Sequence, residues 1–256
     1  MGDPRESPRY GRSVTDFSYR LVCLTHGDSA TLTQALAAFD EHVTPAPTET
    51  MLVIDAATQS EPVVEYIRER QGAAFWSPVP LAPAGFCAAT KCAWALGAQP
   101  GVTHCFYLEH DFLVTRPVDL RELAAVLTDN YGLAQMSLMR DAYSKEEKEA
   151  GGLYQHRLRM GDYQTRRHYA YEDDLDIGDQ MGKETGQYPW LSMSFLTTNP
   201  SLMRRDFMAE YPFVADEPHC EGKFGISLAK QGFEFGTWGD GSVFVRHVGT
   251  RDGFGY

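Results

Sequence analysis

The chain has 256 residues, a formal net charge of -12, and 43% hydrophobic and 12% aromatic residues. This length is near the upper limit for one hydrophobic core, so we expect a single domain at 19–256 behind a flexible N-terminus at 1–18. The acidic excess excludes a protein that coats nucleic acid with Lys and Arg, and no apolar stretch is long enough to span a membrane.

Strand-like and helix-like segments alternate in the first half of the chain. In chain order the hydrophobic spacing predicts a strand at 19–25, a helix containing Leu32, Leu36 and Phe39, a loop at 45–48, a strand at 51–54 ending at Asp55, a helix containing Val63, Val64 and Ile67, an extended segment at 75–83, a helix at 85–97 and a strand at 105–108. Such alternation predicts an α/β fold with a mostly parallel sheet, helices on both faces and ligands at the strand ends.

The alternation stops after Arg140. Residues 141–189 are polar, and a long polar insertion in a compact domain is usually functional, so we interpret it as an insertion or lid. Beyond it the spacing predicts regular structure at 190–197, a helix at 200–208, a short helix at 223–230 and a last strand at 243–245. The insertion therefore separates one half of the domain, 19–140, from another, 190–256.

The cysteines are odd in number and include no Cys-x-x-Cys pair: Cys23, Cys87, Cys92, Cys105 and Cys220. Two of them, Cys23 and Cys105, lie in apolar strand-like runs, so we expect buried reduced thiols rather than a disulfide or a zinc site. The polar N-terminal segment does not resemble a signal peptide. A cytoplasmic protein without a membrane partner is the expectation.

Two acidic residues, Glu109 and Asp111, follow the apolar run that starts at Cys105. Charge at the carboxyl end of a strand in an α/β protein usually faces a ligand crevice. Two carboxylates one residue apart suit a hard divalent cation, which would lie against phosphate. Because neighbours on an extended chain face opposite sides, we expect His110 to point away from that cation.

Short motifs occur along the chain in a fixed order: Thr25-His26 after the first strand, Asp55 after the second, the small-residue segment 85–91 ending at Lys91, Glu109-His110-Asp111, Cys220-Glu221 eleven residues before Gly232, and His247-Val248-Gly249. Together they resemble the nucleotide-sugar glycosyltransferases of the GT-A fold, similar to the family-2 glycosyltransferases. The Asp-x-Asp signature of that family has Glu in its first position here. Lys91 stands where the family often has Asn.

The resemblance implies a metal-dependent hexosyltransferase that moves a sugar from a nucleoside-diphosphate sugar, with a UDP-sugar as the expected donor, to an acceptor hydroxyl. It makes 19–140 the nucleotide-sugar-binding half and 190–256 the acceptor and catalytic half. Donor contacts are assigned to Thr25, His26, Asp55, Lys91 and Glu109. The ligands of Mn2+ or Mg2+ are assigned to Asp111, Glu109 and His247, and the imidazole favours manganese.

The chemistry of sugar transfer asks for two functions from these residues. Negative charge develops on the departing diphosphate, which a bound cation would stabilise. The acceptor hydroxyl needs a general base, and Glu221 is the candidate. A base opposite the diphosphate gives in-line displacement with inversion and no covalent sugar–enzyme intermediate.

The acceptor is predicted from the insertion, where basic and aromatic side chains interleave. Guanidinium groups engage phosphates and aromatic rings stack on bases, so the candidate acceptor-binding residues are Arg157, Arg159, Tyr163, Arg166, Arg167 and Tyr169, with Trp190 directly after the insertion. The resemblance admits a hydroxymethylated pyrimidine of bacteriophage DNA, flipped out of its duplex, as acceptor. A lid whose Arg residues pair with nearby acids is the alternative, and protein, glycan and small-molecule acceptors stay open, as does the oligomeric state.

Each assignment also has a structural alternative. Asp55 could cap a helix, and His247 could be a core histidine. Two other functions remain: a non-catalytic nucleotide-sugar-binding protein, and a nucleotidyltransferase. The second would need a basic phosphate loop after the first strand, but the turn at 26–29 carries no Lys or Arg.

Overall fold

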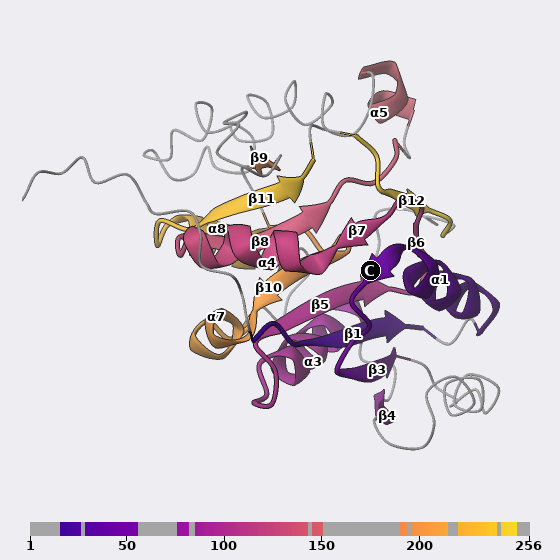
Figure 1. Cartoon of the computed structure of the whole chain (residues 1–256), viewed down its shortest axis with the longest axis horizontal. Coiled ribbons are helices and arrows are strands. Elements are labelled where there is room, and N and C mark those ends of the chain that lie inside the picture. Colours follow the sequence, from indigo (N-terminus) through magenta and orange to yellow (C-terminus); the bar gives the residue numbers. More distant parts are fainter. Residues whose placement is uncertain are drawn as a thin grey trace, which may run out of the picture.

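The computed structural model describes residues 16–26, 29–55, 76–81, 85–142, 145–150, 190–193, 196–214, 220–239 and 242–249. Within these segments a central sheet has eight strands in the order β4-β3-β1-β5-β10-β8-β11-β9 (Figure 1). The strands β4, β3, β1, β5, β8 and β11 run in one direction, whereas β10 and β9 run in the other. The mostly parallel α/β sheet predicted from the sequence is therefore confirmed.

The strands of this sheet, in spatial order, are β4 (Trp76–Leu81), β3 (Glu49–Asp55), β1 (Tyr19–Thr25), β5 (His104–Glu109), β10 (Ser201–Arg204), β8 (Leu133–Leu138), β11 (Glu234–Trp238) and β9 (Trp190–Met193). Two short ladders pair β12 (Val245–His247) with β6 (Phe112–Val114), and β2 (Val43–Thr44) with β7 (Val118–Asp119). The helices are α1 (Ser29–His42), α3 (Phe86–Gly97), α4 (Leu120–Asp129), α5 (Lys145–Ala150), α7 (Arg205–Glu210) and α8 (Cys220–Ala229).

Helices cover both faces of the sheet. One core cluster contains the apolar sides of α1 and α4, and the other contains those of α3, α7 and α8. Because successive strand residues point to opposite faces, Leu21 of β1 lies in the first cluster and its neighbour Val22 in the second. The residues Leu32, Leu36 and Phe39, whose spacing predicted the first helix, are at most 1% exposed.

The ladder of β6 and β12 brings the C-terminal part of the chain to the end of β5. β6 starts three residues after Glu109, and its antiparallel register places His247 opposite Phe112. Val248 N also donates to the Asp111 carbonyl at 2.8 Å. These backbone contacts fix the position of His247 relative to the loop that carries Asp111.

The helix predicted at 200–208 is wrong in its first half. Residues 201–204 form β10, which lies between β5 and β8 in the sheet, and α7 begins directly at Arg205. The short apolar run could not be assigned to strand or helix by periodicity alone. Sheet pairing decides for the strand, and Arg204 reinforces it by donating to the Leu127 and Tyr131 carbonyls at 2.7 and 2.8 Å.

The expectation of reduced thiols throughout is also wrong. Cys87 and Cys220 form a disulfide, with their Cα atoms 5.9 Å apart, inside the range that a disulfide can span. The two residues lie at the starts of α3 and α8, which the sequence predicted as separate helices without predicting that their ends meet. Cys23 and Cys105 are buried and lie outside the disulfide, as expected.

Several other expectations lie outside the described residues or have shifted boundaries. The predicted helix with Val63, Val64 and Ile67 lies outside them, as does most of the insertion, of which 141–142 and α5 are described. The last strand begins at Val245 rather than at 243. Phe17 packs on the core, so the described end of the N-terminal segment is held in place. No helix in the described part of the chain is long and apolar enough to cross a membrane.

His104, at the start of β5, makes the stability of the fold sensitive to acid. Its side chain is buried, and its Nδ1 lies 2.9 Å from Thr103 Oγ1. Burial, together with the charge of Arg204, lowers the His104 pKa from 6.5 to about 4 against the weaker opposing effect of Asp206. The folded state thus resists protonation of a ring that the unfolded chain protonates readily.

The free energy of unfolding should therefore fall by about 3 kcal/mol through this residue as the pH drops from 6.5 to about 4. The stability that neutral His104 contributes is complete above its unfolded pKa of 6.5 and is lost as the pH falls from there towards the folded pKa of about 4. The His104→Gln variant cannot titrate at this position and should lack that loss. Urea unfolding of both proteins at neutral and acidic pH measures the difference. Equal losses of unfolding free energy in the two proteins would show that His104 is not the source of the acid sensitivity.

Candidate active site

Three neighbouring parallel strands end at the same edge of the sheet. In the register of β1 with its neighbours, Leu24 lies opposite Glu109 and Thr25 lies opposite Ile54, the residue before Asp55. Candidate donor-binding residues from distant parts of the sequence therefore meet at one edge. Thr25 is buried, His26 directly after it is exposed, and Asp55 is half-buried.

Two of the predicted metal ligands, Asp111 and His247, are in direct side-chain contact. His247 Nε2 lies 3.0 Å from Asp111 Oδ2, and both side chains are largely buried. Asp141, three residues past the end of β8, accepts a hydrogen bond from the His247 backbone N–H at 3.0 Å. The sequence resemblance assigned the two side chains to one cation, and the fold places them together.

The charge of Asp111 is favoured by this arrangement. Burial alone would raise its pKa, but the hydrogen bond with His247 and the nearby His110 and His247 rings outweigh burial, so the pKa is lowered overall. Asp111 is consequently an anion at neutral pH. An anionic carboxylate beside an imidazole is a donor pair that suits manganese.

Gly249 lies directly against the Asp111 side chain. A Cβ on residue 249 would collide with the Asp111 carboxylate. Gly249→Ala should therefore displace Asp111 from His247 and weaken the Mn2+ binding predicted for this pair about 10- to 100-fold, as disturbed support of a metal ligand typically does. Titration calorimetry with Mn2+ and UDP measures the change.

Gly132→Ala is the matched control, because a Cβ there would meet nothing within 4 Å. It should bind Mn2+ and UDP as the wild type does. An unchanged affinity in Gly249→Ala would show that Asp111 does not need its observed position to bind the cation.

Glu109, Asp111 and Glu221 form what we call the acidic cluster. Burial raises the Glu109 pKa well above its usual range, and repulsion from Asp111 and Glu221 adds to this, against weaker effects of Thr198 and Tyr107. Glu221, in the first turn of α8, accepts a hydrogen bond from the Thr198 backbone N–H through Oε1 at 2.6 Å. The predicted base thus lies within electrostatic reach of the predicted metal site.

The side chains of this cluster fit a bound cation. Glu109 Oε1 and Asp111 Oδ1 are buried and have no hydrogen-bond partner among the described residues. Buried carboxylate oxygens normally have partners, so these two fit a ligand that the protein alone does not supply. No set of three or more His, Cys, Asp or Glu in the described segments could hold a metal ion by itself. A cation here would take further ligands from donor phosphates, as magnesium sites commonly do.

The remaining predicted residues are placed as follows. Lys91 is exposed in the second turn of α3. The ring of buried His110 packs edge-on against that of His26, with centroids 4.3 Å apart. Trp190 begins β9, at the outer edge of the sheet and several strands away from β5. The candidate acceptor residues between 157 and 169 lie outside the described residues.

Sequence reasoning missed Thr198, whose backbone N–H donates to Glu221, and Asp141, whose carboxylate accepts from the His247 backbone N–H. Asp141 carried a usable signal, because it follows an apolar run whose strand, β8, was not predicted and ends at the same edge as β5. Thr198 carried none, because its contribution is a backbone N–H.

Comparison with known proteins identifies the fold. A structure of GalNAc-T7 with UDP, GalNAc and Mn2+ matches with a TM-score of 0.62 at 13% identity, covering 92% of this chain and 44% of that chain. A structure of S. aureus TarS 1–349 matches with a TM-score of 0.55 at 8% identity, covering 91% and 60%. No family model matches the sequence, and no curated protein does. This chain spans less than two thirds of each of the two matched chains. The two matches show that it has the GT-A fold that the resemblance implied.

Proposed function

We propose that this protein is a metal-dependent glycosyltransferase that moves a sugar from a nucleoside-diphosphate sugar to an acceptor hydroxyl. The carrying observation is the contact of Asp111 with His247, next to buried oxygens of Glu109 and Asp111 that have no partner among the described residues. The GT-A fold supports the proposal, and so does the matched GalNAc-T7 structure, which contains UDP and Mn2+. A UDP-sugar with manganese is accordingly the proposed donor complex.

The chain's own residues divide the work of donor binding. Asp111 and His247, with Glu109 directly or through water, would hold Mn2+ or Mg2+. The bound ion would stabilise negative charge on the departing diphosphate as a Lewis acid. Thr25, His26 and Asp55, at the ends of neighbouring strands, are proposed to contact the nucleoside, and Lys91 is proposed to contact the diphosphate.

Glu221 is proposed as the general base. Its carboxylate is held by the Thr198 N–H and would accept the proton of the acceptor hydroxyl. The acceptor oxygen then forms the new bond to the anomeric carbon as the bond to the diphosphate breaks. With one displacement and no covalent intermediate, the anomeric configuration is inverted.

The acceptor proposal rests on the sequence of the insertion. Its interleaved arginines and tyrosines, on a chain with a net charge of -12, support a nucleic-acid strand as acceptor, with a hydroxymethylated pyrimidine of phage DNA as the specific candidate. Protein and glycan acceptors are the alternative. A cytoplasmic location is likewise a proposal. Stable disulfides are rare in the cytoplasm, so alkylation of Cys87 as a thiol in intact cells would support that location.

One experiment tests the donor and the acceptor in turn. Nucleotide sugars are screened by thermal shift with Mn2+, and the best donor is incubated with plain DNA, hydroxymethylated DNA, protein and glycan acceptors. Hexose mass gained only on hydroxymethylated DNA supports the DNA proposal, and gain on another acceptor replaces it. The enzymatic assignment would be overturned if no donor stabilised the protein and none was transferred or hydrolysed.

A further inference from the structure

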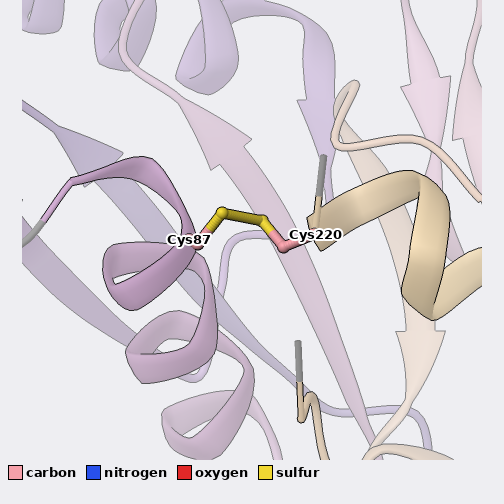
Figure 2. Close-up of a disulfide and its surroundings, with 2 residues drawn as sticks. All are labelled: Cys87 and Cys220. Carbon is pink, nitrogen blue, oxygen red and sulfur yellow. A yellow bond between two sulfur atoms is a disulfide. The ribbon is translucent and has the colours of Figure 1, made fainter. Parts of the chain in front are cut away.

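The Cys87–Cys220 disulfide joins two helices directly beside the proposed base. Cys87 is the second residue of α3 and Cys220 is the first residue of α8, so Glu221 follows the bridge by one residue. Figure 2 shows the bond spanning the first turns of the two helices. The two cysteines are 133 residues apart in sequence, so the bridge connects the donor-binding half to the half that carries Glu221.

Helix α8 has little intrinsic helix-forming stability. Gly222 and Gly225 lie within this ten-residue helix, and glycine is among the least favourable residues in a helix interior. Gly225 packs closely on Leu196, because a Cβ on residue 225 would lie 3.0 Å from Leu196 Cβ, which is tighter than most real Cβ contacts. The close contact with Leu196 therefore favours glycine at position 225, although another residue would stabilise the helix itself better.

The other end of the bridge is firmly held. In α3, Ala89, Ala93 and Trp94 are buried in the core cluster that also contains Cys220. Trp94 Nε1 donates to the Met208 carbonyl at 3.0 Å, which ties α3 to α7. The disulfide thus connects the start of a weak helix to a well-packed helix.

We propose that the Cys87–Cys220 disulfide is a positioning element that holds the Glu221 carboxylate at the acidic cluster. The bridge fixes the start of α8, and the hydrogen bond from Thr198 N–H fixes the carboxylate itself. Both restraints act on adjacent residues of the same turn. This inference rests on the proposed role of Glu221 as general base.

Reduction of the folded protein with a dithiol tests the proposal. The dithiol supplies two electrons and two protons, the S–S bond breaks to give the Cys87 and Cys220 thiols, and the reagent becomes a cyclic disulfide. We expect kcat to fall about 10- to 100-fold, as small misplacements of a catalytic group do, whereas the Kd of UDP with Mn2+ stays the same. Reoxidation should restore kcat.

Serine variants separate the bridge from other effects of the reductant. Cys87→Ser, Cys220→Ser and the double variant should lose the same factor in kcat, because either single change removes the whole bridge, and dithiol should have no further effect on them. Cys92→Ser is the matched control, since Cys92 lies on the same helix α3 and is a free thiol. It should keep both full activity and sensitivity to dithiol.

A second measurement does not depend on turnover. The Thr198 N–H donates to Glu221, so reduction should increase hydrogen exchange of the peptide containing Thr198 while α1 stays protected. This result still tests the positioning if no donor proves active. Unchanged exchange and unchanged kcat would overturn the proposal, and so would exchange that rises equally in α1. Alkylation of both cysteines in the unreduced protein would overturn it as well.

Discussion

Replacing Asp111 with alanine is expected to abolish the stabilisation of the protein by UDP with Mn2+. In the wild type, ligand at about 100 times its Kd should raise the melting temperature by about 5 to 10 °C. Asp111 carries the anionic carboxylate of the Asp111–His247 pair, and its Oδ1 has no protein partner in the described part of the chain. Loss of the cation should lower kcat/KM by at least about 10³-fold, since a bound metal contributes several kcal/mol.

Asp16→Ala is the matched control, because it removes one exposed carboxylate and changes the net charge equally. It should retain the thermal shift and the activity. Differential scanning fluorimetry with UDP alone, Mn2+ alone and both together separates metal binding from nucleotide binding. A full shift in Asp111→Ala would mean that the cation binds elsewhere, and the proposed site would be wrong.

The strands β1, β3 and β5 and the helix α1 were predictable because their signals are local. The strands β1, β3 and β5 are continuous apolar runs, and the helical spacing of Leu32, Leu36 and Phe39 matches their burial in α1. The carboxylates at the ends of these runs identified the edge where the strands meet. The position of Asp111 in the site follows from this local pattern.

The second half was less predictable because its elements depend on distant partners. β10 is defined by pairing with β5 and β8 rather than by its own spacing. The meeting of Cys87 with Cys220 depends on how α3 and α8 pack on one face of the sheet. Contacts that form through backbone atoms, such as that of Thr198 with Glu221, leave no trace in side-chain patterns.

His247 lies between these two cases. Only the resemblance to a family predicted His247 as a metal ligand, because a lone histidine near a strand is usually structural. The β6–β12 ladder supplies the reason for its position, because the register fixes His247 opposite Phe112, one residue after Asp111. Local chemistry and long-range pairing together produce the candidate metal site.

The Glu221→Gln variant should lose about 10²- to 10⁴-fold in kcat while it binds UDP with Mn2+ as the wild type does. Glutamine has nearly the same shape and keeps an oxygen that can accept the Thr198 N–H, but it cannot take a proton from the acceptor. Single-turnover transfer and calorimetry measure the two quantities. Glu210→Gln, at the exposed end of α7, is the matched control and should retain full turnover.

Comparison with Glu221→Ala distinguishes catalysis from local structure. Alanine removes both the base and the acceptor of the Thr198 N–H, so it should lose at least as much kcat as glutamine and also gain hydrogen exchange at Thr198. If glutamine kept full turnover and alanine lost it, the carboxylate would act by holding the 196–198 segment, and Glu221 would not be the base. Loss in both variants with Thr198 protected only in glutamine is the pattern that proton transfer requires.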